Sequence, residues 1–152
     1  LCASRGLGDV YKRQVSYTDE ENLFAQELYK TLLNPDRVIG DQETIQPLVL
    51  SQTKGSTDVG DVSWKVPTSG VRIATWVPGT SSHSWQAVAA GGTSIGTKGS
   101  TLAAKALANS AVRLFEEPAL IKLAWNEHKA NIGDHDYQAL LGDREPPLDY
   151  RK

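Results

Sequence analysis

The chain has little cysteine, little net charge and no long apolar run, and each of these absences excludes a class of protein. Its single cysteine, Cys2, cannot form an internal disulfide, which fits a reducing compartment, and we expect a cytoplasmic protein. Acidic and basic residues nearly balance, 18 against 16, so the net charge of -2 gives no strong attraction to nucleic acid. No apolar run approaches the roughly 20 residues that a membrane-spanning helix needs. We therefore expect a one-domain globular protein that binds neither nucleic acid nor membranes.

Residues 1–14, LCASRGLGDVYKRQ, do not share the pattern of the later residues, since they show no amphipathic period. The string resembles the translated read-through of a sequencing-library adapter, so we interpret it as a foreign scar and exclude it from fold reasoning. Residues 15–152 are then expected to be the C-terminal segment of a longer protein.

The remaining pattern predicts three helices. A capping box of Thr18 and Glu21 opens an amphipathic helix over residues 18–33, in which Leu23, Phe24, Leu28 and Leu32 form one stripe. A second, alanine-rich helix is expected over residues 100–115, capped by Ser100 or Thr101. Pro118 suits the first position of a third helix, and Gly133 suits its end.

Two apolar runs predict strands and therefore an α/β fold with few strands flanked by helices. Residues 45–50 are interrupted by Pro47, which indicates an edge strand. Residues 71–77 alternate, with Val71, Ile73, Thr75 and Val77 on one face, and they predict a strand that Pro78 and Gly79 end. This strand would be central only if Arg72, on the other face, reaches a partner.

The polar groups suited to chemistry lie between Lys54 and Lys98, among turn-forming glycines. The loop GSTDVGD precedes the predicted central strand, and the loop PGTSSHSW comes after it. A rigid strand that aims loop residues into a cleft is a common construction of a site.

Two loop features each have a functional and a structural interpretation. Asp58 and Asp61 are three residues apart, so both carboxylates would share one face of a helix that starts there; alternatively, one is an N-cap and the other is solvated. His83 could bind a metal or carry a proton, with Trp85 as a pocket wall, or it could be merely exposed. His128 and His135 are weaker candidates, because nothing converges on them in the sequence.

Two further resemblances fail. GGTSIGTKGS lacks the glycine-lysine-hydroxyl ending of a phosphate-binding loop, because Thr97 separates Gly96 from Lys98. Ser82 and His83 do not form a serine hydrolase site, because adjacent side chains of an extended chain point to opposite sides.

The run GSTDVGDVSWKVPTSGVRIATWVPGTSSHSWQAVAAGGTSIGTKG resembles the C-terminal catalytic segment of the di-metal amidohydrolases and peptidases, which include aminoacylases and indole-acetyl-amino-acid hydrolases. The likeness extends to the closing LLGDREPPLDYR. It implies a zinc-exopeptidase-type α/β domain interrupted by a dimerisation domain, two divalent ions (zinc or manganese) and a small-molecule amide substrate, such as an aryl-amide conjugate of glutamate.

The same resemblance implies roles for individual residues. His83 matches the family's last metal-ligand histidine, and Asp58 matches an acidic position that lines the active site. With Ser56 and Thr57, Asp58 is expected to orient substrate or support the structure, whereas Asp61 and Ser63 have weaker claims. No catalytic residue is expected in this segment, because the general base and the other ligands belong to the missing N-terminal half.

That half of its own chain, and a second subunit in a homo- or heterodimer, are therefore the expected partners. By itself the segment should be inactive. Two alternatives stay open, namely a general N-acyl-amino-acid or peptide hydrolase and a non-catalytic partner subunit.

Overall fold

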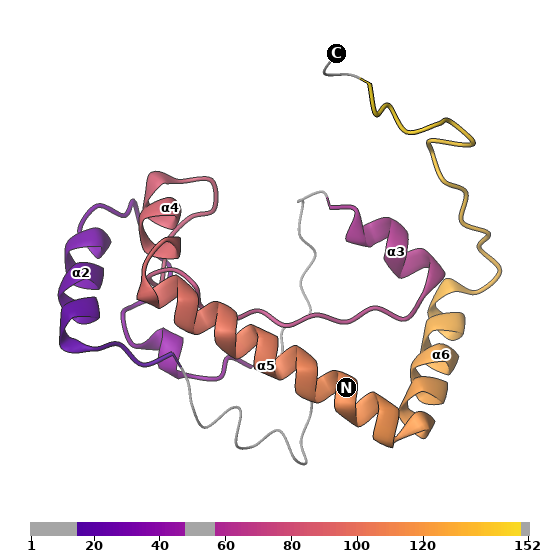
Figure 1. Ribbon diagram of the computed structural model, residues 1–152, viewed down its shortest axis with the longest axis horizontal. Helices are drawn as coiled ribbons and strands as arrows, with labels where there is room; N and C mark the ends of the chain where they lie inside the picture. Colours follow the sequence, from indigo (N-terminus) through magenta and orange to yellow (C-terminus); the bar gives the residue numbers. More distant parts are fainter. Residues whose placement is uncertain (1–14, 48–56, 150–152) are drawn as a thin grey trace. The chain divides into compact units, whose positions relative to one another are not determined.

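A computed structural model of the chain describes residues 15–47 and 57–149. Their elements, shown in Figure 1, are helices: α2 (Asp19–Tyr29), the 3-10 helix η1 (Asp41–Glu43), α3 (Val59–Lys65), α4 (Trp85–Gly91), α5 (Ser94–Glu116) and α6 (Pro118–Ile132). Over these ranges there is no strand, so the predicted α/β class is wrong. None of the described helices is both long enough and apolar enough to cross a membrane.

The chain divides into two compact units. The first is formed by residues 1–50 and 70–116 and carries α2, η1, α4 and α5. The second is formed by residues 51–69 and 117–152 and carries α3 and α6.

A small apolar core holds the first unit together. Its buried members come from α2, α4, α5 and the segment before α4: Ala25, Leu28, Val77, Ala90 and Ile95. The side chains of Val77 and Ile95 are almost completely buried, and burying an aliphatic side chain of this size contributes about 1.5–3 kcal/mol. The core therefore ties the segment that precedes α4 to three helices.

Helix α2 confirms the predicted capping box. The Glu21 N–H donates to the Thr18 hydroxyl, and the Thr18 N–H donates to the Glu21 carboxylate. The helix ends at Tyr29, earlier than expected, and Lys30 is its C-cap. Of the predicted apolar stripe only Leu28 is fully buried, while Leu23 is 65% exposed.

The predicted strands are the main correction to the sequence analysis. Residues 71–77 have no regular secondary structure, with a bend at Trp76, and they form no ladder with any described residue. The segment instead lies against α5, since a Cβ added at Gly99 would be 2.2 Å from the Ala74 carbonyl oxygen. Burial does not follow the alternation either, since Val71 is exposed, whereas Ala74 and Trp76 are half-buried like Ile73 and Thr75. Residues 45–47 form no strand either, and residues 48–50 lie outside the described ranges.

Helix α5 starts six residues before the predicted start, at Ser94 rather than Ser100. The glycines of GGTSIGTKGS suggested a loop, but Gly96 and Gly99 are buried inside the helix. A Cβ at Gly96 would lie 2.2 Å from the Gly91 carbonyl oxygen of α4. These glycines therefore permit close backbone packing of α5 against α4 and against residues 74–75.

The second unit contains α3 and α6. Helix α3 confirms that a helix can start in the GSTDVGD segment. Pro118 begins α6 and Gly133, with φ of 59°, ends it, as predicted. No residue of α6 is buried.

Candidate functional site

The loop that carries His83 is anchored on both sides. Val77, which is buried, precedes it, and the Thr80 N–H donates to the Val77 carbonyl oxygen at 3.1 Å. Gly79 has φ of +82°, and a Cβ there would lie 2.6 Å from the Pro35 Cβ, so only glycine fits this approach. After the loop, the Gln86 side-chain amide donates to the Thr31 carbonyl oxygen at 3.2 Å.

His83 itself has an unusual backbone conformation. Its φ is 59°, in the left-handed region that residues other than glycine seldom adopt, although histidine does so more readily than most. Its side chain is exposed and makes no hydrogen bond or ion pair with another described residue. No described residue therefore occupies the ring nitrogens of His83.

Ser84 closes the turn around His83. Its hydroxyl donates to the Ser81 carbonyl oxygen at 2.7 Å and accepts the Ala87 N–H at 3.2 Å, which makes Ser84 the N-cap of α4. Trp85, expected as a pocket wall, is the first residue of α4 and is 61% exposed. The sequence indicated neither α4 nor this cap, because the serines and glycines resembled an open loop.

Thr57 and Asp58 of the GSTD segment lie in the second unit, whereas His83 lies in the first. Asp58 is the N-cap of α3, as the structural interpretation expected, although its side chain makes no capping bond. The Thr57 hydroxyl accepts the Val59 N–H at 3.4 Å, and the Ser63 hydroxyl donates to the Gly60 carbonyl oxygen at 2.7 Å. Ser56 lies outside the described residues.

An aromatic cluster in the second unit was missed from sequence. The rings of His135 and Trp64 have centroids 4.6 Å apart, and the Tyr137 ring lies nearly parallel to Trp64 at 6.3 Å. The Tyr137 hydroxyl donates to the Asp61 carboxylate, and this bond is the main cause that raises the pKa of Tyr137. Lys65 donates to the Tyr137 carbonyl oxygen at 3.1 Å. The expectation that nothing converges on His135 was therefore wrong.

His128 makes a single ring contact of the same kind. Its ring lies edge-on to Trp125 of α6, with 5.4 Å between centroids. It gains no polar partner among the described residues, which agrees with its low rank as a candidate.

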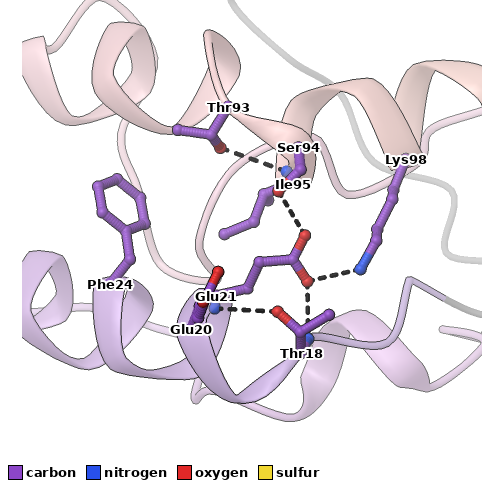
Figure 2. Close-up of a pocket in the computed structure, with 8 residues that line it drawn as sticks. All are labelled: Thr18, Glu20, Glu21, Phe24, Thr93, Ser94, Ile95 and Lys98. Carbon is purple, nitrogen blue, oxygen red and sulfur yellow. Dashed lines mark hydrogen bonds and ion pairs between the residues drawn. The ribbon is translucent and has the colours of Figure 1, made fainter.

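A cavity of about 520 Å³ opens between the start of α2 and the start of α5. Figure 2 shows the Glu21 carboxylate directed toward Ser94 and Lys98, with the Phe24 ring to one side. The Ser94 hydroxyl and the Lys98 ammonium each lie 2.5 Å from a Glu21 oxygen. Lys98 also donates to the Ser16 carbonyl oxygen at 3.1 Å.

These contacts determine the ionisation of Glu21. Burial by itself would raise its pKa, but hydrogen bonds from Lys98, Ser94 and the Thr18 amide, with the charge of Lys98, outweigh burial. Together they lower the pKa from 4.5 to about 2. Because both carboxylate oxygens are already paired, the cluster serves as an anchor between α2 and α5.

The described residues do not assemble a complete metal site. Nowhere in residues 15–47 and 57–149 do three His, Cys, Asp or Glu side chains come close enough to hold a metal ion together. A zinc site takes about three or four protein ligands, so the described residues alone do not form one.

Comparison with known proteins connects the chain to one component of a hydrolase. The relative is the B subunit of p-aminobenzoyl-glutamate hydrolase from Escherichia coli (strain K12), and the two are 46% identical over 92 residues. The match covers 60% of this chain and 19% of the relative, so the chain spans about a fifth of the relative's length. The resemblance read from the residues is thereby confirmed. No protein-family model matches the chain, and no solved structure matches it.

Proposed function

We propose that this chain is a C-terminal segment of a metal-dependent amidohydrolase that cleaves p-aminobenzoyl-glutamate to p-aminobenzoate and glutamate. The observation that carries this proposal is the 46% identity over 92 residues to a protein of that name. Residues 15–152 are the natural part, and residues 1–14 are foreign.

His83 is one metal ligand in this proposal. Three features support the role: its imidazole is exposed, it is unpaired among the described residues, and it sits at a turn with a positive φ of 59°. Backbone strain of this kind costs about 1–3 kcal/mol and is concentrated at functional sites. An imidazole nitrogen is also an ordinary ligand of zinc and manganese enzymes.

Two divalent ions, when bound, would polarise the amide carbonyl and lower the pKa of a bound water. This chain's own contribution is the His83 imidazole and the Asp58 carboxylate, which is exposed and makes no capping bond. Asp58, beside Thr57 and Ser56, is proposed to orient the substrate, for instance by accepting a hydrogen bond from an amide or amine N–H.

The remaining ligands and the general base are proposed to lie on the part of the longer chain that precedes residue 15. One histidine cannot hold a pair of ions, so the 152-residue chain by itself should hydrolyse nothing. Because the relative is named as a subunit, we propose that the complete protein works in a homo- or heterodimer.

The test is hydrolysis by the longer protein that carries this segment, purified with its metal. Release of p-aminobenzoate should be faster than release of amino acid from N-acetyl-amino acids or dipeptides, and a chelator should abolish it. Faster turnover of N-acyl-amino acids would replace the proposal with a general acyl-amino-acid hydrolase. No turnover of any substrate, by the protein alone, would indicate a non-catalytic partner subunit.

A further inference from the structure

We propose that Ser84 is a positioning residue that sets the direction of the His83 imidazole; this inference rests on the proposed role of His83 as a metal ligand. The Ser84 hydroxyl reaches back to the Ser81 carbonyl oxygen at 2.7 Å, so Ser82 and His83 are the two residues enclosed by this bond. The same hydroxyl caps α4 by accepting the Ala87 N–H at 3.2 Å. One side chain thus joins the His83 turn to a helix.

The backbone at His83 explains why such a bond is needed. A non-glycine residue with φ of 59° is disfavoured and persists only where its surroundings impose it. Ser84 is extended, with φ of -119° and ψ of 157°, so its side chain can bridge the preceding turn and the first turn of α4. The hydrogen bond from Ser84 to Ser81 is the contact that closes the turn around the strained residue.

The segments on either side of the turn are already fixed. Before it, Gly79 packs directly against Pro35 and the Arg37 carbonyl oxygen, which itself accepts the Tyr29 hydroxyl at 2.7 Å. After it, Gln86 donates to the Thr31 carbonyl oxygen. Both anchors lie on the segment that follows α2, residues 31–37. The backbone between these anchors can still change conformation at residues 80–83, and the Ser84 hydrogen bond restricts that change.

Substitutions at residue 84 can separate the two bonds of Ser84. Threonine keeps both the donor and the acceptor. Aspartate keeps a good N-cap acceptor for the Ala87 N–H but cannot donate to the Ser81 carbonyl oxygen when ionised. The negative charge of Asp would by itself strengthen the binding of a nearby cation. Weaker metal binding by Ser84→Asp would therefore result from a change in the position of His83 and not from the added charge.

The first measurement is nuclear magnetic resonance of the 152-residue chain. Positive φ brings the amide proton and the α proton of one residue close together, so His83 should give a strong cross-peak between them. Ser84→Thr and the control Ser82→Ala should keep this cross-peak. Ser84→Asp should weaken it while residues 85–91 keep their helical chemical shifts.

The second measurement is the Zn²⁺ dissociation constant of the longer protein, by competition with a chromophoric chelator. Ser84→Asp should raise it about tenfold or more, as loss of an orienting contact to a ligand does, while Ser84→Thr and Ser82→Ala should not. Wild-type affinity in Ser84→Asp, or weaker affinity with an unchanged His83 cross-peak, would overturn the positioning role. If His83→Ala leaves Zn²⁺ affinity unchanged, the proposed role of His83 as a metal ligand fails as well. If His83→Ala weakens Zn²⁺ binding but Ser84→Asp does not, the ligand role of His83 stands and only the positioning role of Ser84 fails.

Discussion

Lys98 of α5 lies 2.5 Å from the buried carboxylate of Glu21 in α2, across 77 residues of sequence. The same carboxylate accepts the Ser94 hydroxyl and the Thr18 N–H, so one side chain joins the starts of two helices. The two helices also share the apolar core that contains Val77, the residue just before the His83 loop. The ion pair therefore supports the platform on which that loop is built.

Glu21→Ala should destabilise the first unit by about 2–3 kcal/mol, because it removes the ion-pair partner of Lys98 and the acceptor of the Ser94 hydroxyl and the Thr18 amide. Urea unfolding followed by circular dichroism measures the change. Glu20→Ala is the matched control, since it removes an exposed carboxylate from the same helical turn, and it should change stability by no more than about 0.5 kcal/mol. Equal effects of the two substitutions would contradict the anchoring role.

Acid should weaken the fold through the same residue. The pKa of Glu21 falls from 4.5 to about 2 on folding, so its contribution is fully present above pH 4.5 and is lost as the pH falls toward 2. The free energy of unfolding of the wild type should therefore decrease over this window. Glu21→Gln should show a shallower decrease, because residue 21 then no longer titrates; identical slopes would exclude Glu21 as the cause.

The glycines of α5 give a third prediction. Gly99→Ala should cost about 1–3 kcal/mol despite the higher helix propensity of alanine, since the new Cβ would lie 2.2 Å from the Ala74 carbonyl oxygen. Gly60→Ala in α3 is the control, because nothing lies within 4 Å of a Cβ there. It should be neutral or stabilising by up to about 1 kcal/mol. A stabilised Gly99→Ala variant would show that α5 does not pack closely on residues 74–75.

The second unit can be tested through Tyr137. Its pKa is raised chiefly by the hydrogen bond to Asp61. Asp61→Asn should therefore bring the phenolate titration of Tyr137 to lower pH, which near-ultraviolet difference absorbance between the variant and the wild type detects. Asp58→Asn is the control, since Asp58 makes no contact with Tyr137, and it should leave the titration in place. A shift caused by Asp58→Asn, or none caused by Asp61→Asn, would contradict this contact.

Local signals in the sequence predicted local structure well. The capping box at Thr18 and Glu21, Pro118 at the start of α6 and Gly133 at its end all depend on residues within one turn of each other, and all three are confirmed. The two strands were predicted from different signals, a short apolar run at residues 45–50 and alternation at residues 71–77, and neither forms a strand among the described residues. Neither signal carries information about a partner strand.

The sequence identified single candidate residues of the site but not the contacts between residues far apart in the chain. Sequence reasoning identified His83 as a candidate, but it indicated neither the positive φ of His83 nor the cap that Ser84 makes on α4. The contacts of Glu21 with Ser94 and Lys98, and of Asp61 with Tyr137, join residues more than 70 positions apart. No periodicity or spacing indicates such pairs, because they arise from how the helices pack.

The measurement that tests the central claim most directly is the metal content of the longer protein with His83→Ala, beside His135→Ala as a second exposed histidine. The proposed role predicts that His83→Ala loses bound metal and amide hydrolysis together, whereas His135→Ala retains both. Normal metal content with normal turnover in His83→Ala would contradict the assignment of His83 as a ligand.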